Sequence, residues 1–181
     1  MRRVVIGHDA AGKAIFTSDG EPPVQVIHEG GGLQIAKLWS TDGVPTLPAT
    51  AADPTLQPHP YFPGPGGTRF LVVHFPPAAA SERALAQGVD MDRATRNFLD
   101  RLPGLGDLME PDHPGMHVSH TVDYGMVLVG EIDLELDDGV RKRLKAGDVY
   151  VLNGGRHAWH NPGPETCVLA AVVVGASLRR P

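Results

Sequence analysis

The chain has 181 residues, a formal net charge of -5 and a single cysteine. This length and composition are typical of one soluble globular domain, and a mildly acidic chain without a basic run argues against binding to nucleic acid or to a membrane surface. A lone cysteine cannot form an internal disulfide. With no apolar stretch near the ~20 residues that span a bilayer and no signal-peptide core, the chain is predicted to be cytoplasmic.

Short apolar runs separated by Gly and Pro fill the first 40 residues. Gly and Pro residues in such places indicate turns between strands, so we expect strands at 3–6, 13–17, 24–28 and 33–39. Residues 41–67 are rich in proline and lack a helical or strand period. They predict a long ordered loop against the surface, followed by a strand at 68–75.

Residues 81–102 carry the only convincing helical pattern. Apolar side chains recur at spacings of three and four, which places on one helix face Met91, Ala94, Phe98 and Leu102. Asp90 precedes this face and can cap the helix, because its carboxylate can accept a backbone N–H of the first turn. We expect the helix either to pack against the outside of a barrel or to cover its mouth as a lid.

From residue 116 to residue 176 the pattern is β throughout, with strands expected at 126–130, 131–136, 141–144, 149–152 and 167–174. Asp137, Asp138 and Gly139 predict a hairpin turn between two of these strands, since Asp and Gly tolerate the positive φ that such turns require. No internal repeat is present. The sequence therefore predicts an all-β chain forming a single domain over 1–181.

The segment from Gly115 to Gly130 resembles the first conserved motif of the cupin family, which is His-x-His, three or four residues, Glu, six residues, Gly. His117 matches the first His, and Ser119 stands where the second His is expected. Asp123 stands in place of the Glu, and six residues separate it from Gly130.

The segment from Gly147 to Asn161 resembles the second cupin motif. Gly154, His157 and Asn161 match it, whereas the proline usual before that glycine is missing. The resemblance covers residues 113–176, and within the family the sequence resembles small single-domain bacterial cupins. It implies a double-stranded β-helix, or jelly-roll barrel, with extra N-terminal strands and one inserted helix. It also implies a homodimer that pairs through the N-terminal strands.

Cupins often hold a metal ion inside the barrel, and the resemblance assigns its ligands to His117, Asp123 and His157. The spacing agrees, because side chains at i, i+2 and i+6 of a strand share one face, which His117, Ser119 and Asp123 do and His120 does not. Such a set suits one divalent transition metal, with Fe, Zn, Mn, Ni and Cu all open. The alternative for the histidines is a core imidazole that donates to a backbone carbonyl, and for Asp123 a turn cap.

Three functions are compatible with these residues. The first is a metal-dependent enzyme for a small oxygen-rich molecule, in which a Lewis-acid metal assists decarboxylation, dehydration, isomerisation or cyclisation, and Tyr124 or His120 exchanges protons. The second is an Fe(II)-dependent dioxygenase. The third is a metal-free binding or sensor protein, which the loss of the second His to Ser119 favours. Cys167 has no activating neighbours in the sequence and is expected to be a small buried side chain.

Overall fold

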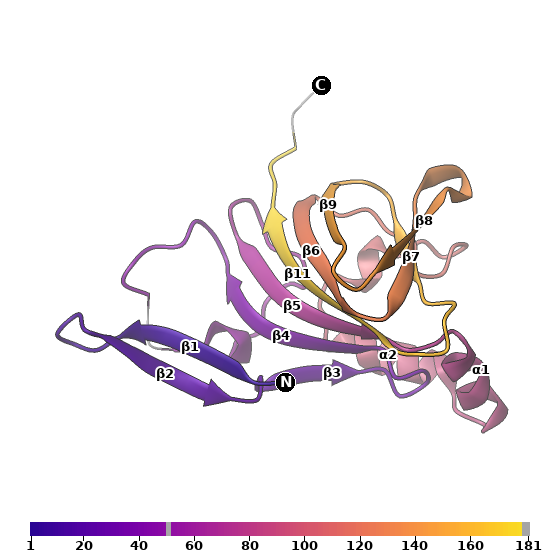
Figure 1. Cartoon of the computed structure of the whole chain (residues 1–181), viewed down its shortest axis with the longest axis horizontal. Coiled ribbons are helices and arrows are strands. Elements are labelled where there is room, and N and C mark those ends of the chain that lie inside the picture. The colour runs from indigo at the N-terminus through magenta and orange to yellow at the C-terminus, as the bar shows by residue number, and fades with distance from the viewer. Residues whose placement is uncertain (50–51, 179–181) are drawn as a thin grey trace.

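The computed structural model describes residues 1–49 and 52–178 (Figure 1). Its strands are β1 Arg3–His8, β2 Ala14–Gly20, β3 Val24–Ile27, β4 Gln34–Thr41, β5 Thr68–Phe75, β6 Thr121–Val129, β7 Glu131–Glu135, β8 Arg141–Lys145, β9 Val149–Asn153, β10 Ala158–His160 and β11 Cys167–Gly175. Its helices are α1 Ala79–Ala86 and α2 Met91–Asp100, with short 3-10 turns η1 Pro54–Leu56, η2 Gly106–Leu108 and η3 Asp137–Gly139.

Two antiparallel sheets form the body of the molecule. The large sheet has six strands in the order β3-β4-β5-β11-β6-β9, and the small sheet has three in the order β10-β7-β8. Side chains of both sheets meet in one buried cluster, where Val127 of β6 and Leu169 of β11 pack with Ile132 of β7. The strands β1 and β2 form a separate hairpin that projects from the body (Figure 1). The observed barrel and extra N-terminal strands confirm the predicted fold class.

The helical segment differs from the single helix expected over 81–102. Gly88, at φ 81°, separates α1 from α2, because a left-handed backbone conformation cannot continue an α-helix. Asp90 caps α2 as predicted, accepting the backbone N–H of Arg93 at 2.9 Å. Within the described residues, neither helix has the length and apolar character needed to cross a membrane.

Helix α2 packs on the inner face of the large sheet, which neither sequence-based alternative anticipated. Phe98, together with Leu102 just beyond the helix, joins a buried cluster that includes Ile35, Leu71 and Val173. Strand register places these sheet residues on the same side as Gly125 and Asp123 of β6. Helix α2 therefore covers the same side of the large sheet on which Asp123 lies.

The proline-rich loop, which was expected to lie against the surface, also packs against the core. Its Tyr61 and Phe62 are partly buried and pack against the cluster that contains Phe98 and Leu102. The Tyr61 N–H donates to the Pro103 carbonyl at 2.8 Å, which ties the loop to the end of the helical segment. The loop therefore carries aromatic side chains toward the barrel interior.

The outer side of the small sheet is charged. Arg143 pairs with Asp133 and with Glu131, the latter at 2.7 Å, and Arg141 pairs with Glu135 at 2.6 Å. These pairs link neighbouring strands β7 and β8, where opposite charges face each other across the ladder. This side of the barrel is therefore built to face water.

Candidate functional site

The two motif histidines lie directly opposite each other. His117 precedes β6 and His157 precedes β10, and their backbones exchange two hydrogen bonds, N–H to C=O, each at 3.0 Å. The centroids of the two rings are 4.4 Å apart, with the ring planes at 52°. His157 is buried and His117 is partly buried. The structure thus brings together the two imidazoles that the cupin motifs singled out.

Each of these imidazoles has its Nδ1 atom engaged by the backbone. His117 Nδ1 donates to the Gly115 carbonyl at 3.0 Å, and His157 Nδ1 donates to the Gly155 carbonyl at 2.9 Å. A carbonyl only accepts hydrogen bonds, so Nδ1 carries the proton and the lone pair of the neutral ring lies on Nε2. Both rings are therefore oriented as metal ligands or proton acceptors through Nε2.

Burial keeps both rings neutral. It lowers the pKa of His157, with the Gly155 carbonyl opposing, and it lowers the pKa of His117, to which the neighbouring His157 adds. Both groups therefore favour the uncharged form more than a free histidine does. A neutral imidazole is the form that binds metals.

Asp123 lies in β6 on the inward side and is 7% exposed. Burial raises the pKa of its carboxyl, against the opposing influence of the Thr121 hydroxyl and of His117. Among the residues that the structure describes, its Oδ1 atom is buried without a hydrogen-bond partner. An orphaned buried carboxylate oxygen is costly, so it marks a position that favours a ligand or an ion.

Ser119 does not replace the missing second histidine. Its side chain is buried on the inward side, and its hydroxyl is hydrogen-bonded to that of Thr121 at 2.7 Å. This bond satisfies both hydroxyls locally. Ser119 therefore fills the motif position with a small polar pair instead of a third imidazole.

Aromatic side chains that the sequence interpretation missed surround this polar group. Phe62 lies against the His117 ring, with centroids 5.9 Å apart, and Trp159 lies 6.1 Å from the His157 ring. The ring of Tyr150 stacks near Trp159 at 4.9 Å. Burial, with the nearby Asp123 carboxylate, strongly raises the pKa of both Tyr61 and Tyr150, so both hydroxyls keep their protons at neutral pH.

Tyr150 occupies its place because the residue opposite it is a glycine. Tyr150 lies on β9, and its register partner on the neighbouring strand β6 is Gly125. A Cβ atom at Gly125 would lie 2.5 Å from Cε1 of Tyr150, which real side chains do not tolerate. The Tyr150 ring therefore lies across β6, between the inward positions of Asp123 and Val127.

The structure does not bring Tyr124 and His120 to this site. Tyr124 follows Asp123 on β6, so its side chain lies on the opposite face of the sheet, where it is 54% exposed. His120 is also exposed; it lines a separate hollow of about 470 Å³ that shares Phe62 as a wall. The proton-exchanging role predicted for these two residues at the metal site therefore loses its geometric basis.

The loop that carries His157 is fixed by an ion pair. The Arg156 guanidinium donates two hydrogen bonds of 2.6 Å to the carboxylate of Glu110, in the bidentate geometry that is the strongest for this pair. Glu110 follows Met109, whose backbone bridges to His117. One salt bridge thus clamps together the segments that supply the two histidines.

The predicted three-ligand set is only partly assembled. His117 and His157 are side by side, whereas among the described residues no three His, Cys, Asp or Glu side chains lie close enough together to hold a metal. The donor chemistry still fits a metal: two neighbouring imidazoles carry their lone pairs on Nε2, and Asp123 offers a buried oxygen that no protein group in the described parts satisfies. Cys167 is buried, and burial together with Glu131 raises the pKa of its thiol to about 11, which keeps it unreactive.

A model of the cupin domain family matches residues 106–174, which contain both histidines, Ser119 and Asp123. Sequence relatives among characterised proteins come from fungi, whereas the motifs alone suggested bacterial stand-alone cupins. Oryzines biosynthesis cluster protein J of Aspergillus oryzae is 44% identical over 54 residues, which are 28% of this chain and 30% of that protein.

A cupin-domain-containing oxidoreductase, virC of Hypocrea virens, is 44% identical over 46 residues, which cover 25% of this chain and 24% of virC. The aligned part thus spans a quarter to a third of these relatives. Among solved structures, the cupin domain of Schizosaccharomyces pombe Cnp3 is similar with a TM-score of 0.48 at 13% identity, covering 96% of this chain and 87% of that one. A cupin 2 conserved barrel protein of Salinispora arenicola gives 0.41 at 17% identity, covering 83% and 82%.

Proposed function

Because this chain belongs to the cupin superfamily through the domain at residues 106–174, we propose that it is an enzyme that acts on a small oxygen-bearing organic molecule. In this proposal His117 and His157 hold one divalent transition metal, and Asp123 contributes directly or through water. The observation that carries the proposal is the neighbouring pair of a buried and a partly buried histidine, whose Nδ1 atoms are engaged by carbonyls so that each ring carries its lone pair on Nε2.

A bound metal would act as a Lewis acid toward a substrate carbonyl or enolate oxygen. The protein groups around it have separate tasks. The Tyr61 and Tyr150 hydroxyls stay protonated and can donate hydrogen bonds to substrate oxygens. Phe62 and Trp159 flank the two imidazoles and exclude water from them. This combination suits decarboxylation, dehydration, isomerisation or cyclisation, in which an oxyanion develops and is stabilised.

In this assignment the tyrosines replace Tyr124 and His120 as the proton-holding groups. Burial raises the pKa of the Asp123 carboxyl, so in the metal-free protein this side chain takes up a proton more readily than a free aspartate does. Asp123 and Tyr150 take inward positions on the neighbouring strands β6 and β9, and the proposal places the substrate on this side of the sheet. Gly125 contributes by leaving room for the Tyr150 ring.

Oxidation is the second candidate reaction, and the names of the relatives favour it. Two of the fungal relatives are named cupin-domain-containing oxidoreductases. An Fe(II) ion held by two imidazoles and a carboxylate has open positions that suit O₂. The two reactions differ in their need for oxygen, so full turnover under anaerobic conditions would eliminate the dioxygenase.

The proposal is tested by metal loading of the purified protein. Chelated protein is dialysed against Fe(II), Zn(II), Mn(II), Ni(II) or Cu(II), and the metal content is measured by elemental analysis. We expect about one ion per chain, as tight protein sites normally fill, and a loss of binding in H117A and in H157A. The matched control is H120A, which removes an exposed imidazole outside the site.

Equal metal content in H117A, H157A and the unchanged protein would contradict the assignment. A content below about a tenth of an ion per chain, unrestored by added metal, would favour the metal-free binding protein instead. That third reading draws its support from Ser119, whose hydroxyl is bonded to Thr121.

A further inference from the structure

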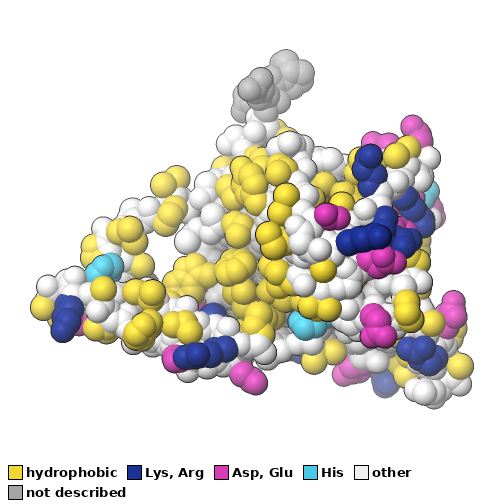
Figure 2. All heavy atoms as spheres, in the orientation of Figure 1, with side chains coloured by type: hydrophobic (Ala, Val, Ile, Leu, Met, Phe, Trp, Pro, Cys, Tyr) yellow, Lys and Arg dark blue, Asp and Glu magenta, His cyan; other side chains and the backbone are white. Residues whose placement is uncertain are grey.

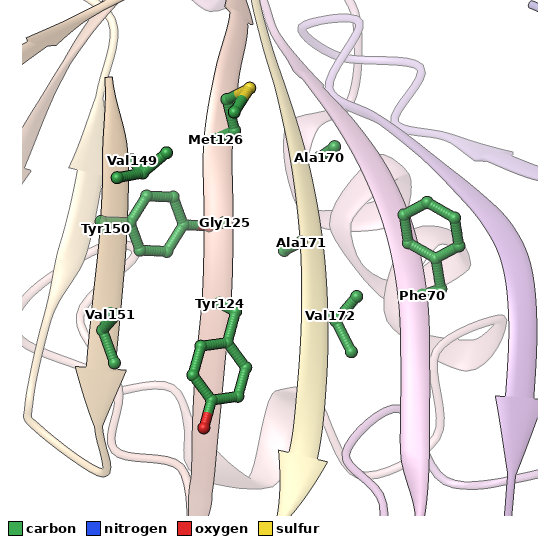
Figure 3. Close-up of a pocket in the computed structure, with 10 residues that line it drawn as sticks. All are labelled: Phe70, Tyr124, Gly125, Met126, Val149, Tyr150, Val151, Ala170, Ala171 and Val172. Carbon is green, nitrogen blue, oxygen red and sulfur yellow. The ribbon is translucent and has the colours of Figure 1, made fainter. Parts of the chain in front are cut away.

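Strand β4 places a lysine on the inner side of the large sheet. Figure 3 shows Phe70 of β5 on the outer side, together with Tyr124 and Met126 of β6. The next residue of β5, Leu71, therefore points inward, where it joins a buried cluster of the core. Lys37 is the register partner of Leu71 on β4, so its side chain starts on this inner side as well, and it is only 8% exposed.

The ammonium group of Lys37 lacks a counter-ion among the described residues. Within 1–49 and 52–178 no ion pair or hydrogen bond involves its Nζ atom, and the charges that influence it are the guanidinium groups of Arg69 and Arg101. Surface cations differ: Arg141 and Arg143 of β8 pair with carboxylates, and Figure 2 shows basic beside acidic side chains over the small sheet. A buried charge without a partner is costly, so this position favours an anion beside Lys37.

A second buried cation adds to the positive charge around Lys37. Arg69 is 2% exposed, and its guanidinium donates to three backbone carbonyls and to Asp42, at 2.7–3.1 Å. These bonds hold the Arg69 side chain in place. The Asp42 side chain is 74% exposed, so water screens its charge. Two buried cations therefore have one solvated carboxylate between them.

A buried histidine completes what we call the basic cluster, defined by Lys37, His59 and Arg69. His59 is 6% exposed, and its Nδ1 donates to the Gln57 carbonyl at 2.7 Å, which leaves the lone pair of the neutral ring on Nε2. Burial lowers the pKa of His59, and the charges of Arg69 and Lys37 lower it further, against the Gln57 carbonyl and Asp42. A bound anion would act in the opposite sense, because a negative charge favours the protonated ring.

Small solutes can reach the Lys37 ammonium. Among the described residues, the buried side-chain atoms that lack a partner are Arg3 Nε, Asp123 Oδ1 and His160 Nε2, and Lys37 Nζ is not one of them. Since Nζ also has no protein partner in these parts of the chain, its remaining contact is with solvent. The 8% exposure of Lys37 sets a size limit, because so small an opening admits a small ion and excludes a bulky one.

We propose that the basic cluster binds one small carboxylate, of the size of formate or acetate, at the Lys37 ammonium. The N–H donors of this ammonium are unused by the described residues, and a carboxylate accepts strong, charge-assisted hydrogen bonds from such a group. Its second oxygen suits an imidazole that becomes a donor once protonated, as at His59. The cluster comes from β4, β5 and the proline-rich loop, and none of its members is a metal ligand in the proposed function, so the inference does not rest on that function.

The test uses chelated, metal-free protein, so that a carboxylate cannot bind to an ion at the histidine pair. Sodium formate replaces sodium gluconate, a bulky carboxylate, at constant ionic strength and pH 7. Binding is followed by the line width of ¹³C-labelled formate and by the midpoint of urea denaturation. We expect saturable broadening and a higher midpoint with formate and with acetate, but not with gluconate. A ligand of so few atoms binds with a Kd of roughly 1 mM at the tightest.

Two lysine variants make the assignment specific. K37M removes the buried charge at a similar side-chain length, and it should weaken formate binding at least about tenfold, the scale of one charge-assisted hydrogen bond. K142M is the matched control, because Lys142 is an exposed lysine of β8, and it should bind formate as the unchanged protein does. Without formate, K37M should be as resistant to urea as the unchanged protein or more so, since it buries no unpaired charge.

Far-ultraviolet circular dichroism checks that each variant is folded, and K37Q replaces K37M if that variant is not. H157A separates the basic cluster from the histidine pair, because it alters that pair and leaves Lys37 in place. Formate binding that is lost in H157A and kept in K37M would assign the anion to the histidines and overturn the proposal. Equal effects of formate and gluconate, equal binding by K37M and the unchanged protein, or no saturable binding would each overturn it as well.

Discussion

Replacing Gly125 by alanine tests the packing of Tyr150 across β6. The added Cβ atom would lie 2.5 Å from Cε1 of the Tyr150 ring, and that ring is held in turn against Trp159 at 4.9 Å. Since the ring cannot swing away without leaving Trp159, the variant must strain the core. Overpacking of this kind costs about 1–3 kcal/mol, which corresponds to a fall in Tm of roughly 2–12 °C for a chain of this size.

Urea denaturation of four proteins measures this directly: the unchanged chain, G125A, Y150A and the double variant. Y150A should lose about 3 kcal/mol by analogy with other large aromatic truncations. In the double variant the clash is absent, so its free energy of unfolding should equal that of Y150A instead of falling further. The control is G43A, because a Cβ at Gly43 meets no atom within 4 Å. Unchanged stability of G125A, or additive losses in the double variant, would refute the described packing.

Three further variants test the Arg3–Asp53 ion pair at the base of the β1–β2 hairpin, the contact of Phe62 with His117, and the hydrogen bonds of Asn161 in the second motif. D53N leaves Arg3 buried without its charged partner and should cost about 3 kcal/mol. Burial opposes the ionised form of Asp53, but the hydrogen bonds from Arg3 and Thr55 outweigh it and lower the pKa of the carboxyl, so the stabilisation is complete above the ordinary Asp pKa near 4 and is lost as the pH falls through the lower folded value. Denaturation between pH 2 and 5 should show this loss of stability in the unchanged protein and not in D53N. F62A uncovers the His117 ring, so diethyl pyrocarbonate should modify His117 several-fold faster by mass spectrometry, whereas M126A, changed on the opposite sheet face, should leave the rate unchanged. N161D replaces an amide that donates to two carbonyls, at 2.8 and 2.7 Å, by a carboxylate facing them, and should cost about 2–4 kcal/mol at pH 7, more than N161S does.

The inward side of the first motif could be predicted from residue spacing alone. The structure buries Ser119 and Asp123 and leaves His120 exposed, as period-two alternation from His117 requires. The same rule places Tyr124 outside, because it is the next residue after Asp123. The cap at Asp90 and the turn at residues 137–139 also depend on local chemistry, which explains why the sequence revealed them.

The rest of the site depends on contacts between distant segments. Tyr61 and Phe62 come from a proline-rich loop without periodicity, so no pattern indicated that they reach His117. The place of Tyr150 depends on the register between β9 and β6, which a single sequence does not supply. Whether Asp123 comes close enough to both histidines also depends on the three-dimensional fold. Its carboxylate is influenced by His117, but among the described residues it does not form a three-residue metal site with the two imidazoles.

The unlike outer sides of the barrel set a limit on assembly. A chain with apolar side chains on both sheets could add copies indefinitely and polymerise into fibres. Here the ion pairs of Arg141 and Arg143 would have to be stripped of water before another molecule could stack on the small sheet. Of the two sheets that the structure describes, the large sheet is therefore the one whose outer side an apolar contact can cover without stripping water from ion pairs.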